Sequence, residues 1–254
     1  MVKRILIKIG TATVTKNQRL DLEWIREKTG EIAKLKNEII LITSGAVGAG
    51  MEVEGLSKRP TGNLELQLLS GKGQVQLMES YNDSFKRHNV QTAQVLLTHH
   101  NFKTKEEVVN IKNVVNAYVK EGTIPIINTN DVVTSEEFNL GHGFTDNDEL
   151  AALVAVALDV DLLLILTDVD GLCTKDPRRN NCYDLVKCVK KVDAKVKAMA
   201  SKEGSIMGLG GMLSKVEAAR KVNAKGIVTV VANGKYKIKD VLSGKVNRTV
   251  FECG

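Results

Sequence analysis

Charged and polar side chains stand where short apolar runs of the sequence end, and these are positions at which an anionic ligand can be bound. Lys8 lies near the end of the run RILIKI, and Ser44 and Gly45 follow the run IILIT. A lysine inside a buried strand needs an anionic partner or a route to solvent, and the N–H groups of a glycine turn before a helix can hold an oxyanion. Both features are also typical of plain structure, namely a lysine that reaches solvent at a sheet edge and a glycine turn that permits close packing.

A second group of polar residues, in the segment INTNDVV, follows another apolar run. Asn128, Asn130 and Asp131 offer amides and a carboxylate, which suit the recognition of an ammonium or amide group. The same residue types form tight turns, because their side chains hydrogen-bond to their own backbone. Composition alone favours the turn and leaves ligand recognition open.

The segment TDNDEL precedes an apolar helical pattern, and its polar residues have two interpretations. Thr145 and Asp146 can cap a helix that runs to Leu158, and acids in a first turn complement the helix dipole. Capping accounts less well for Asn147 and Asp148. A carboxylate of this segment that lay close to two lysines would hold both lysines in place, and helix capping does not provide for such a role.

The glycine-rich segment GLGGMLSK, residues 208 to 215, leads into another helical pattern. No window of the chain fits GxxxxGK followed by Ser or Thr, which excludes a Walker loop. A lysine in the first turns of a glycine-led helix points toward the helix N-terminus, where the dipole favours phosphate. Lys215 is therefore a candidate phosphate ligand, although a solvated surface lysine would look the same in sequence.

The segment LTDVDGLCTKDPR follows the fourth of the apolar runs. Its aspartates Asp168, Asp170 and Asp176 resemble a fragment of a calcium-binding loop. The glycine position and terminal glutamate of an EF-hand do not follow, however. A loop around a nucleotide is the better interpretation.

The composition is that of a globular protein with an anionic partner. Of 254 residues, 43% are hydrophobic, and 36 Lys and Arg against 30 Asp and Glu give a formal charge of +6. The lysines are scattered and aromatic residues make up only 4%, which favours a small acidic ligand over a nucleic acid. We expect neither a signal peptide nor a membrane span. Because the four cysteines include no CxxC pair, a cytoplasmic location is expected.

The elements that must position these residues alternate between strands and helices. Runs with almost no polar alternation are typical of strands buried on both faces of a parallel sheet, so the pattern predicts an α/β sandwich, in one domain with two lobes around a cleft. The expected strands span 4–9, 39–43, 123–128, 161–167 and 226–232. The expected helices span 21–36, 66–85, 105–121, 147–158, 211–224 and 236–243, the second of them interrupted by Gly71 and Gly73.

In their order along the chain these motifs resemble the amino acid kinase family. The shared segments are IKIGT, ITSGAVGAG, LQLLSGKGQ, IPIINTNDVV, TDNDEL, LLLILTDVDGL with DPR, and GLGGMLSK. Among them TSGAV, INTND and the GQ of the long helix are most similar to the members that phosphorylate glutamate. The resemblance implies a three-layer α/β/α sandwich around a mainly parallel sheet. Residues 1–254 would then form a single kinase domain with an N-terminal acceptor-substrate lobe and a C-terminal ATP-binding lobe.

The same resemblance implies transfer of the γ-phosphoryl group of ATP to the γ-carboxylate of L-glutamate, the first step of proline biosynthesis. Mg²⁺ would be held through the ATP phosphates and not by dedicated protein ligands. A homo-oligomer, dimer or tetramer, is expected, and feedback inhibition by proline and coupling to a glutamyl phosphate reductase fit the pathway. Many relatives carry a C-terminal PUA domain of RNA-binding type; here we expect none, and no RNA role.

Carried over by motif, the residue roles fall into three sets. Lys8 and Lys215 would neutralise the transferred group from opposite sides, and Asp148 would orient both lysines. Glutamate would be held by Ser44, Asp131 and Asn147, with Asn128 as an addition. The ATP site would be lined by Lys8, Thr167, Asp168, Leu209, Gly210, Gly211, Met212, Leu213, Ser214 and Lys215.

Two positions depart from the pattern of the family. Cys173 stands in a loop where relatives usually have a tyrosine, and Leu209 stands where they usually have a threonine. Packing against the nucleoside and one polar phosphate contact are therefore expected to differ in this chain.

Three other functions fit parts of the sequence. A family member that acts on acetylglutamate, aspartate or UMP would share the fold, but the longer glycine run of acetylglutamate kinases and the KFGGT-like start of aspartokinases are missing. A Rossmann dehydrogenase would need GxGxxG, which occurs nowhere in the chain. A non-catalytic amino-acid sensor would not require Lys8, Lys215 and Asp148 together.

Overall fold

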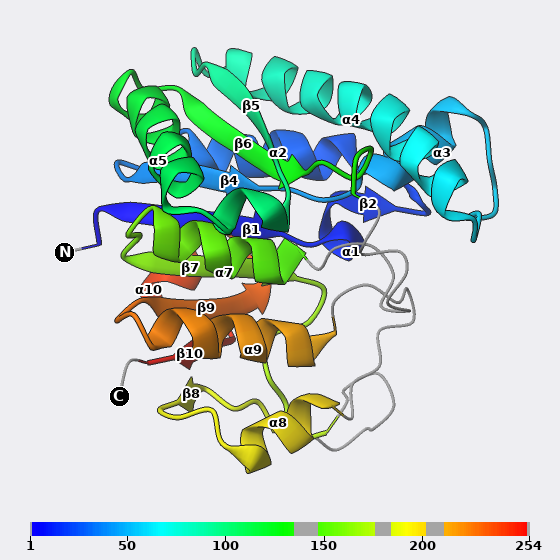
Figure 1. Ribbon diagram of the computed structural model, residues 1–254. Helices are drawn as coiled ribbons and strands as arrows, with labels where there is room; N and C mark the ends of the chain where they lie inside the picture. Colours follow the sequence, from blue (N-terminus) through cyan, green and yellow to red (C-terminus); the bar gives the residue numbers. More distant parts are fainter. Residues whose placement is uncertain (1, 135–146, 176–183, 202–210, 253–254) are drawn as a thin grey trace.

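The computed structural model describes residues 2–134, 147–175, 184–201 and 211–252 (Figure 1). Within these ranges, eight strands form one sheet in the order β5-β6-β4-β1-β7-β9-β10-β8. Their bounds are β1 Arg4–Ile9, β4 Glu38–Ile42, β5 Thr92–Leu97, β6 Ile124–Thr129, β7 Leu162–Thr167, β8 Cys188–Val189, β9 Val228–Asn233 and β10 Arg248–Phe251. All neighbours pair in parallel except β9 with β10, which confirms the predicted mainly parallel sheet.

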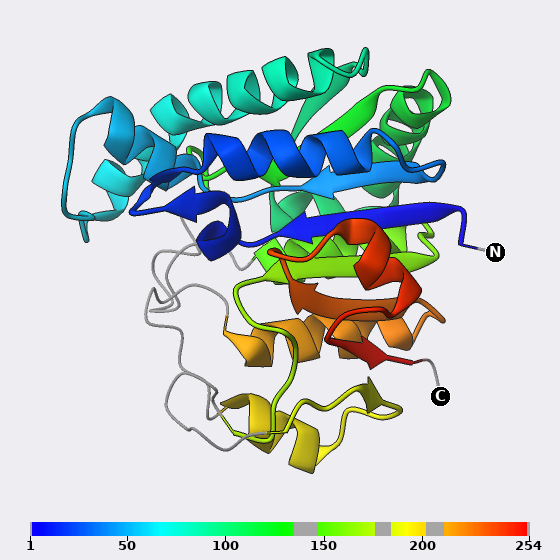
Figure 2. The ribbon, with the colours of Figure 1, turned by 180° about the vertical axis from the view of Figure 1, so that it is seen from behind.

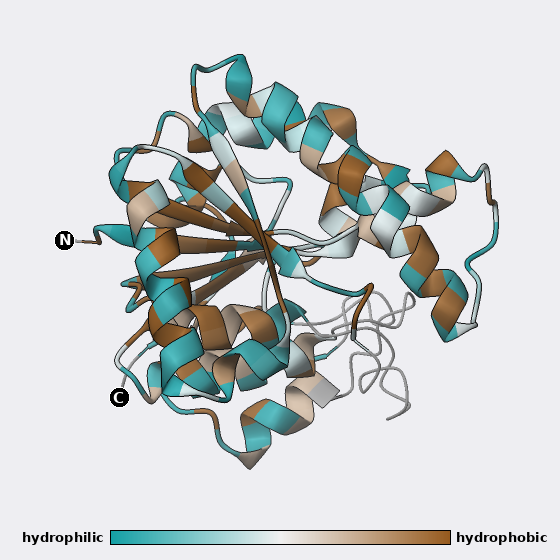
Figure 3. Cartoon of the chain, turned by 45° about the horizontal axis from the view of Figure 1, so that its top comes forward, coloured by the Kyte–Doolittle hydropathy of each residue, from teal (hydrophilic) through white to brown (hydrophobic). Residues whose placement is uncertain are grey.

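Helices cover both faces of the sheet and complete the three layers (Figures 1 and 2). One face is covered by α2 (Leu22–Ile32), α4 (Asn63–Lys86) and α10 (Ile238–Ser243), with α3 (Ala46–Val53) packed on α4. The other face is covered by α5 (Lys105–Lys120), α7 (Asn147–Ala157) and α9 (Met212–Asn223), with α8 (Ala194–Ser201) beside α9. Shorter elements are α1 (Thr11–Val14), the hairpin of β2 (Thr15–Lys16) and β3 (Arg19–Leu20), and the 3-10 helix η1 (His99–Phe102). Figure 3 shows the central strands in brown, hydrophobic along their length and enclosed by the helices.

Alternate residues of the central strand β1 enter different hydrophobic cores. Ile5, Ile7 and Ile9 pack in the core shared with α2, α4 and α10. Leu6 packs in the core shared with α5, α7 and α9. Because side chains alternate across a strand, Lys8 lies on the same face as Leu6. The pleat of the strand therefore directs this lysine toward α7 and α9.

The structure contains the five predicted strands and the six predicted helices, with small shifts at their ends. It also contains β5, β8, β10 and α8, which the sequence did not predict. The strand β5 lies at the edge of the sheet and is mostly half-buried, so its sequence TAQVLL lacks the long apolar run by which buried strands were identified.

The long helix α4 is continuous, so the predicted interruption at Gly71 and Gly73 is wrong. Asn63–Lys86 forms one helix of 24 residues. A Cβ atom on Gly73 would lie only 1.8 Å from the backbone oxygen of Ala46, and one on Gly50 would lie 2.0 Å from the backbone oxygen of Leu69. The glycines therefore do not break the helix, and Gly73 and Gly50 let the backbones of α3 and α4 approach each other closely.

This contact gives a matched pair of substitutions in α4. We expect Gly73→Ala to lower the free energy of unfolding by about 2 kcal/mol or more, because the added methyl group meets fixed backbone. Gly71→Ala should leave stability unchanged or raise it by up to about 1 kcal/mol through helix propensity, since among the described residues its Cβ meets the exposed side chain of Val132, 3.3 Å away, and no backbone atom. Urea unfolding of both variants measures the difference. Equal stabilities would contradict the close approach of α3 and α4.

Candidate active site

Three charged side chains from three elements meet at the carboxyl end of β1. Lys8 comes from β1, Asp148 from the first turn of α7 and Lys215 from the first turn of α9. Asp148 is completely buried, and each lysine is only 4% exposed. Lys8 Nζ lies 2.5 Å from Asp148 Oδ1, and Lys215 Nζ lies 3.0 Å from Asp148 Oδ2. The structure thus brings these three predicted residues together and shows that Lys8 is paired with a carboxylate and does not extend to solvent.

The environment of Asp148 keeps its carboxyl group ionised. Burial alone would raise its pKa, but the charges of Lys215 and Lys8, with hydrogen bonds from Lys8 and Ser214, outweigh burial and hold the pKa well below its ordinary value. Two ammonium groups against one carboxylate give the three side chains a formal charge of +1. This excess positive charge, enclosed in a site of low dielectric, is suited to an anionic group such as a transferring phosphoryl.

Helix α9 begins beside these three residues. Gly211 is the N-cap residue, and no side chain of the described residues caps the helix there. Ser214 Oγ lies 2.7 Å from Asp148 Oδ2 and 2.8 Å from the backbone oxygen of Gly211. Of the other predicted ATP ligands on this segment, Met212 is buried and Leu213 is exposed. Leu209 and Gly210 lie outside the described residues.

Amide and hydroxyl groups form a network next to the lysines. Asn147, the first residue of α7, donates from Nδ2 to the backbone oxygen of Thr43 at 2.9 Å and to Ser44 Oγ at 2.7 Å. The same Nδ2 lies 3.2 Å from Asn128 Oδ1, and Thr129 Oγ1 donates to Asn147 Oδ1. Ser44, Asn128 and Asn147 were all predicted to bind the acceptor substrate. Their network joins the ends of β4 and β6 to α7. Thr145 and Asp146, predicted as caps, lie outside the described residues.

Asp131 lies on the side of this network nearest to α4. Its Oδ2 accepts a hydrogen bond of 2.9 Å from Ser70 Oγ on α4. Burial lowers the pKa of Arg59, and the nearby charge of Asp131 opposes that shift. Sequence reasoning missed both Ser70 and Arg59. Ser70 lies inside the segment LQLLSGKGQ, which could have drawn attention to it, whereas Arg59 stands in a segment without a motif.

Thr167 and Asp168 lie at the end of β7, the strand next to β1. Thr167 Oγ1 donates to Asp168 Oδ1 at 3.1 Å, and Asn233 Nδ2 donates to the backbone oxygen of Asp168 at 3.0 Å. Cys173 is buried, with Sγ 3.7 Å from the backbone oxygen of Gly171. The position at which relatives usually have a tyrosine therefore packs into the interior of this chain.

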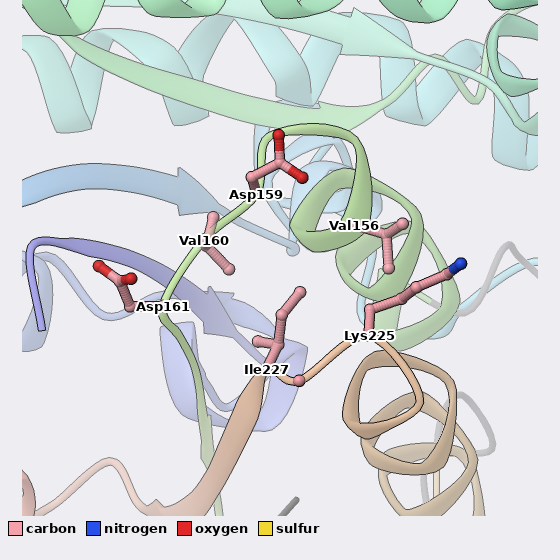
Figure 4. A pocket seen from close by; sticks show the side chains of 7 residues that line it. Val156, Asp159, Val160, Asp161, Lys225 and Ile227 are labelled. Carbon is pink, nitrogen blue, oxygen red and sulfur yellow. The ribbon is translucent and has the colours of Figure 1, made fainter.

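A surface hollow at the opposite end of the strands shares no residue with this site (Figure 4). It lies at the amino ends of β7 and β9, and its lining includes Asp159 and Asp161. Asp161 Oδ2 accepts hydrogen bonds from the backbone nitrogens of Lys3 and Arg4, and Asp159 pairs with Lys112. These two carboxylates therefore link neighbouring segments of the chain. The candidate site remains the one around Lys8, at the carboxyl ends of the strands.

The described residues contain no cluster of three or more His, Cys, Asp or Glu side chains that could hold a metal ion. In the part of the chain that the structure describes, none of the helices has the length and apolar character needed to cross a membrane.

Comparison with known proteins identifies a family for most of the chain. Residues 3–233 match the model of the Amino acid kinase family. The chain is 40% identical over 237 residues to a glutamate 5-kinase of Herminiimonas arsenicoxydans, covering 92% of this chain and 63% of that protein. It is 38% identical over 255 residues to a glutamate 5-kinase of Nitrosococcus oceani, covering 98% of this chain and 67% of that protein. The chain thus spans about two thirds of the length of the curated relatives it matches.

Solved structures with the same fold are more distant in sequence. The product complex of isopentenyl phosphate kinase from T. acidophilum matches with a TM-score of 0.68 at 17% identity, covering 98% of this chain and 100% of that one. Carbamate kinase from Giardia lamblia, bound to AMP-PNP, matches with a TM-score of 0.68 at 16% identity, covering 99% and 98% of the two chains. At such identities the similarity bears on the fold alone, and it confirms the predicted three-layer sandwich.

Proposed function

Because the chain belongs to the amino acid kinase family, we propose that it transfers the γ-phosphoryl group of ATP to the γ-carboxylate of L-glutamate. The observation that carries this proposal is the buried carboxylate of Asp148, which holds Lys8 and Lys215 with one positive charge in excess. The curated relatives at 38% and 40% identity are named glutamate 5-kinase, which supports glutamate as the acceptor. The biological role would be the first step of proline biosynthesis.

In the proposed step, a γ-carboxylate oxygen of glutamate attacks the γ-phosphorus of ATP. The bond from that phosphorus to the β,γ-bridging oxygen breaks, and the products are L-glutamyl 5-phosphate and ADP. Since a glutamate carboxyl group with a pKa of about 4.3 is already ionised at neutral pH, no base has to remove a proton. Catalysis then depends on positioning and on positive charge around the transferring group, which Lys8 and Lys215 would supply.

Asp148 would act on the lysines and not on the substrate. Each of its carboxylate oxygens faces one ammonium group, so the two lysines are held apart and oriented before substrate binds. Such preorganised charge costs no rearrangement during the reaction. Asp148 is therefore a positioning residue in this proposal.

The acceptor would bind at the ends of β4 and β6. Ser44 and Asn147 offer a hydroxyl and an amide close to the lysines, in the place where the γ-carboxylate would lie. Asp131 offers a carboxylate for the α-ammonium group of glutamate. Asn128 would support Asn147, from which it accepts a hydrogen bond. These four residues and Lys8 would form the acceptor half of an N-terminal lobe.

ATP would bind along the end of β7 and the start of α9. The N-terminus of α9, with Gly211 as its N-cap, provides N–H groups and a dipole that favour phosphate. Thr167 and Asp168 would line the same site, in a C-terminal lobe. Mg²⁺ would enter with ATP, since this ion keeps phosphate and water ligands in nucleotide sites, and it would supply neutralising charge on the phosphates.

Several features of the cellular role extend this proposal. Glutamyl phosphate is a reactive acyl phosphate, so a glutamyl phosphate reductase that consumes it is the expected functional partner. We propose a dimer or tetramer in the cytoplasm, with proline as a feedback inhibitor. Neither nucleic acid nor membrane is needed for the reaction.

Turnover of ATP with a panel of acceptors tests the proposed function. We expect Mg²⁺-dependent ADP release with L-glutamate, and little with N-acetylglutamate, aspartate or UMP. N-acetylation removes the positive charge that Asp131 would bind, which makes N-acetylglutamate the sharpest comparison. ADP release with another acceptor and none with glutamate would overturn the assignment.

A further inference from the structure

Gln74, on the face of α4 that meets the end of β6, has a buried amide nitrogen without a hydrogen-bond partner. Its side chain is nearly enclosed, with the residue 7% exposed. Gln74 Oε1 accepts a hydrogen bond of 2.8 Å from Asn128 Nδ2. Gln74 Nε2 donates to no atom of the residues that the structure describes. Buried polar groups are nearly always hydrogen-bonded in proteins, so a donor in this position calls for a ligand or another cause.

Two backbone groups determine which end of each amide faces which neighbour. The backbone oxygen of Thr43 can only accept, so Asn147 must present its nitrogen there. The backbone nitrogen of Thr129 can only donate, so Asn128 must present its oxygen there. Asn128 Nδ2 therefore donates to Gln74, and Gln74 must accept this hydrogen bond with Oε1. The nitrogen of Gln74 is left as the donor at the end of this chain of amides.

The position of Gln74 places this donor between two parts of the acceptor site. One helical turn earlier on α4, Ser70 donates to Asp131 Oδ2, and residues four apart lie on the same helix face. Gln74 also accepts a hydrogen bond from Asn128, and Asn128 in turn accepts one from Asn147, the residue next to Asp148. Gln74 thus lies on the same face of α4 as Ser70, the residue that contacts Asp131.

We propose that Gln74 is a further substrate-binding residue, whose Nε2 donates a hydrogen bond to the α-carboxylate of bound glutamate. This inference rests on the proposed function, in which Asp131 binds the α-ammonium group. The α-carboxylate is attached to the same carbon as that ammonium group, so a donor on the helix face that contacts Asp131 is placed to meet it. Hydrogen bonds to an ionised oxygen are short and strong, and an ammonium group, which only donates, cannot be the partner of Gln74 Nε2.

The variant Gln74→Glu tests the assignment with little change of shape. Its carboxylate still accepts from Asn128, but it lacks the donor and repels the α-carboxylate of the substrate. We expect the KM for glutamate to rise by about tenfold or more, the effect of losing about 1.4 kcal/mol of binding. The kcat and the KM for ATP should stay unchanged, because the α-carboxylate takes no part in the chemical step and contributes equally to ground-state and transition-state binding.

Gln91→Glu is the control, with the same substitution at an exposed position after the end of α4. Because its side chain is exposed and lies outside the site, this variant should keep the wild-type KM for glutamate. If Gln74→Glu shows no thermal unfolding transition, Gln74→Met removes the donor without adding charge and should show the same rise in KM. The expected rise in either variant, absent from the control, supports the assignment.

Three results would overturn the assignment, and they can be told apart. An unchanged KM for glutamate in both Gln74 variants, with wild-type activity intact, would refute the role of Gln74 and leave the proposed function standing. A fall in kcat with unchanged KM would place the amide against the reacting γ-carboxylate. Absence of glutamate phosphorylation by the wild-type protein would refute the proposed function and, with it, this inference.

Discussion

Replacement of Lys8 or of Lys215 by alanine is expected to lower kcat for glutamate phosphorylation by about 100-fold or more in each variant. Both ammonium groups are buried and held by Asp148, so each acts as a fixed positive charge that needs no rearrangement during phosphoryl transfer. Removal of one preorganised donor from such a site typically costs two to three orders of magnitude. Steady-state kinetics at saturating ATP and glutamate measure the effect.

The same variants also separate catalysis from stability. Each variant keeps one lysine against Asp148, so the carboxylate retains a partner and the chain is expected to fold. Lys34→Ala, which removes an exposed lysine on the surface, serves as the control and should keep the wild-type kcat. Nearly normal kcat in both Lys8→Ala and Lys215→Ala would refute the proposal that the two lysines neutralise the transferred group.

Replacement of Asp148 by asparagine is expected to destabilise the folded protein by about 3–5 kcal/mol at neutral pH. The substitution keeps the shape of the side chain but leaves two buried ammonium groups without a counter-charge. An uncompensated buried charge is far more costly than a broken surface pair. Urea unfolding of the wild-type protein and the variant gives the difference in free energy of unfolding.

The pH dependence of this difference follows from the lowered pKa of Asp148. Because the folded-state pKa lies below the ordinary value of 3.8, the unfolded chain takes up the proton first as the pH falls. The stabilisation is fully present above the ordinary value and is lost as the pH falls below it toward the folded-state pKa. The gap between wild type and Asp148→Asn should therefore be largest at neutral pH and should shrink in acid.

An exposed ion pair provides the control for the asparagine substitution. Asp159 pairs with Lys112 at the surface, where its side chain is 74% exposed. Exposed pairs contribute about 0–1 kcal/mol, so Asp159→Asn should change the free energy of unfolding only slightly. If Asp148→Asn is no less stable than Asp159→Asn at neutral pH, the buried carboxylate does not hold the lysines as described.

Much of the site could be predicted because its residues lie at the ends of elements that are visible in the sequence. Lys8 and Thr167 lie at or near the ends of apolar runs, and parallel strands bring such ends to one edge of the sheet. Lys215 follows a run of glycines at the start of a helix, where a side chain reaches the helix N-terminus. Local patterns of this kind depend only on neighbouring residues, so they can be read without the tertiary structure.

Residues on α4 could not be predicted in the same way. Ser70, Gln74 and Arg59 reach the site only because α4 and the loop before it lie against the ends of β4 and β6. Even the glycines of α4 predicted an interruption that does not exist, since Gly73 serves the close approach of α3, which no local pattern reveals. The side of a helix that a residue occupies can be deduced from sequence, but the partner on that side cannot.

The sequence by itself determined the alternation of strands and helices, the mainly parallel sheet and the order of the motifs, because hydrophobic periodicity and glycine turns act over a few residues. It left Lys8 with two interpretations, a partner or a route to solvent, and Asn147 and Asp148 without a settled role. Only the tertiary structure decided that Lys8 is paired, since Lys8 and Asp148 are 140 residues apart in the sequence and meet through the packing of α7 on the sheet. Burial supplies the physical reason: two ammonium groups can be enclosed there because a carboxylate from another element is enclosed with them.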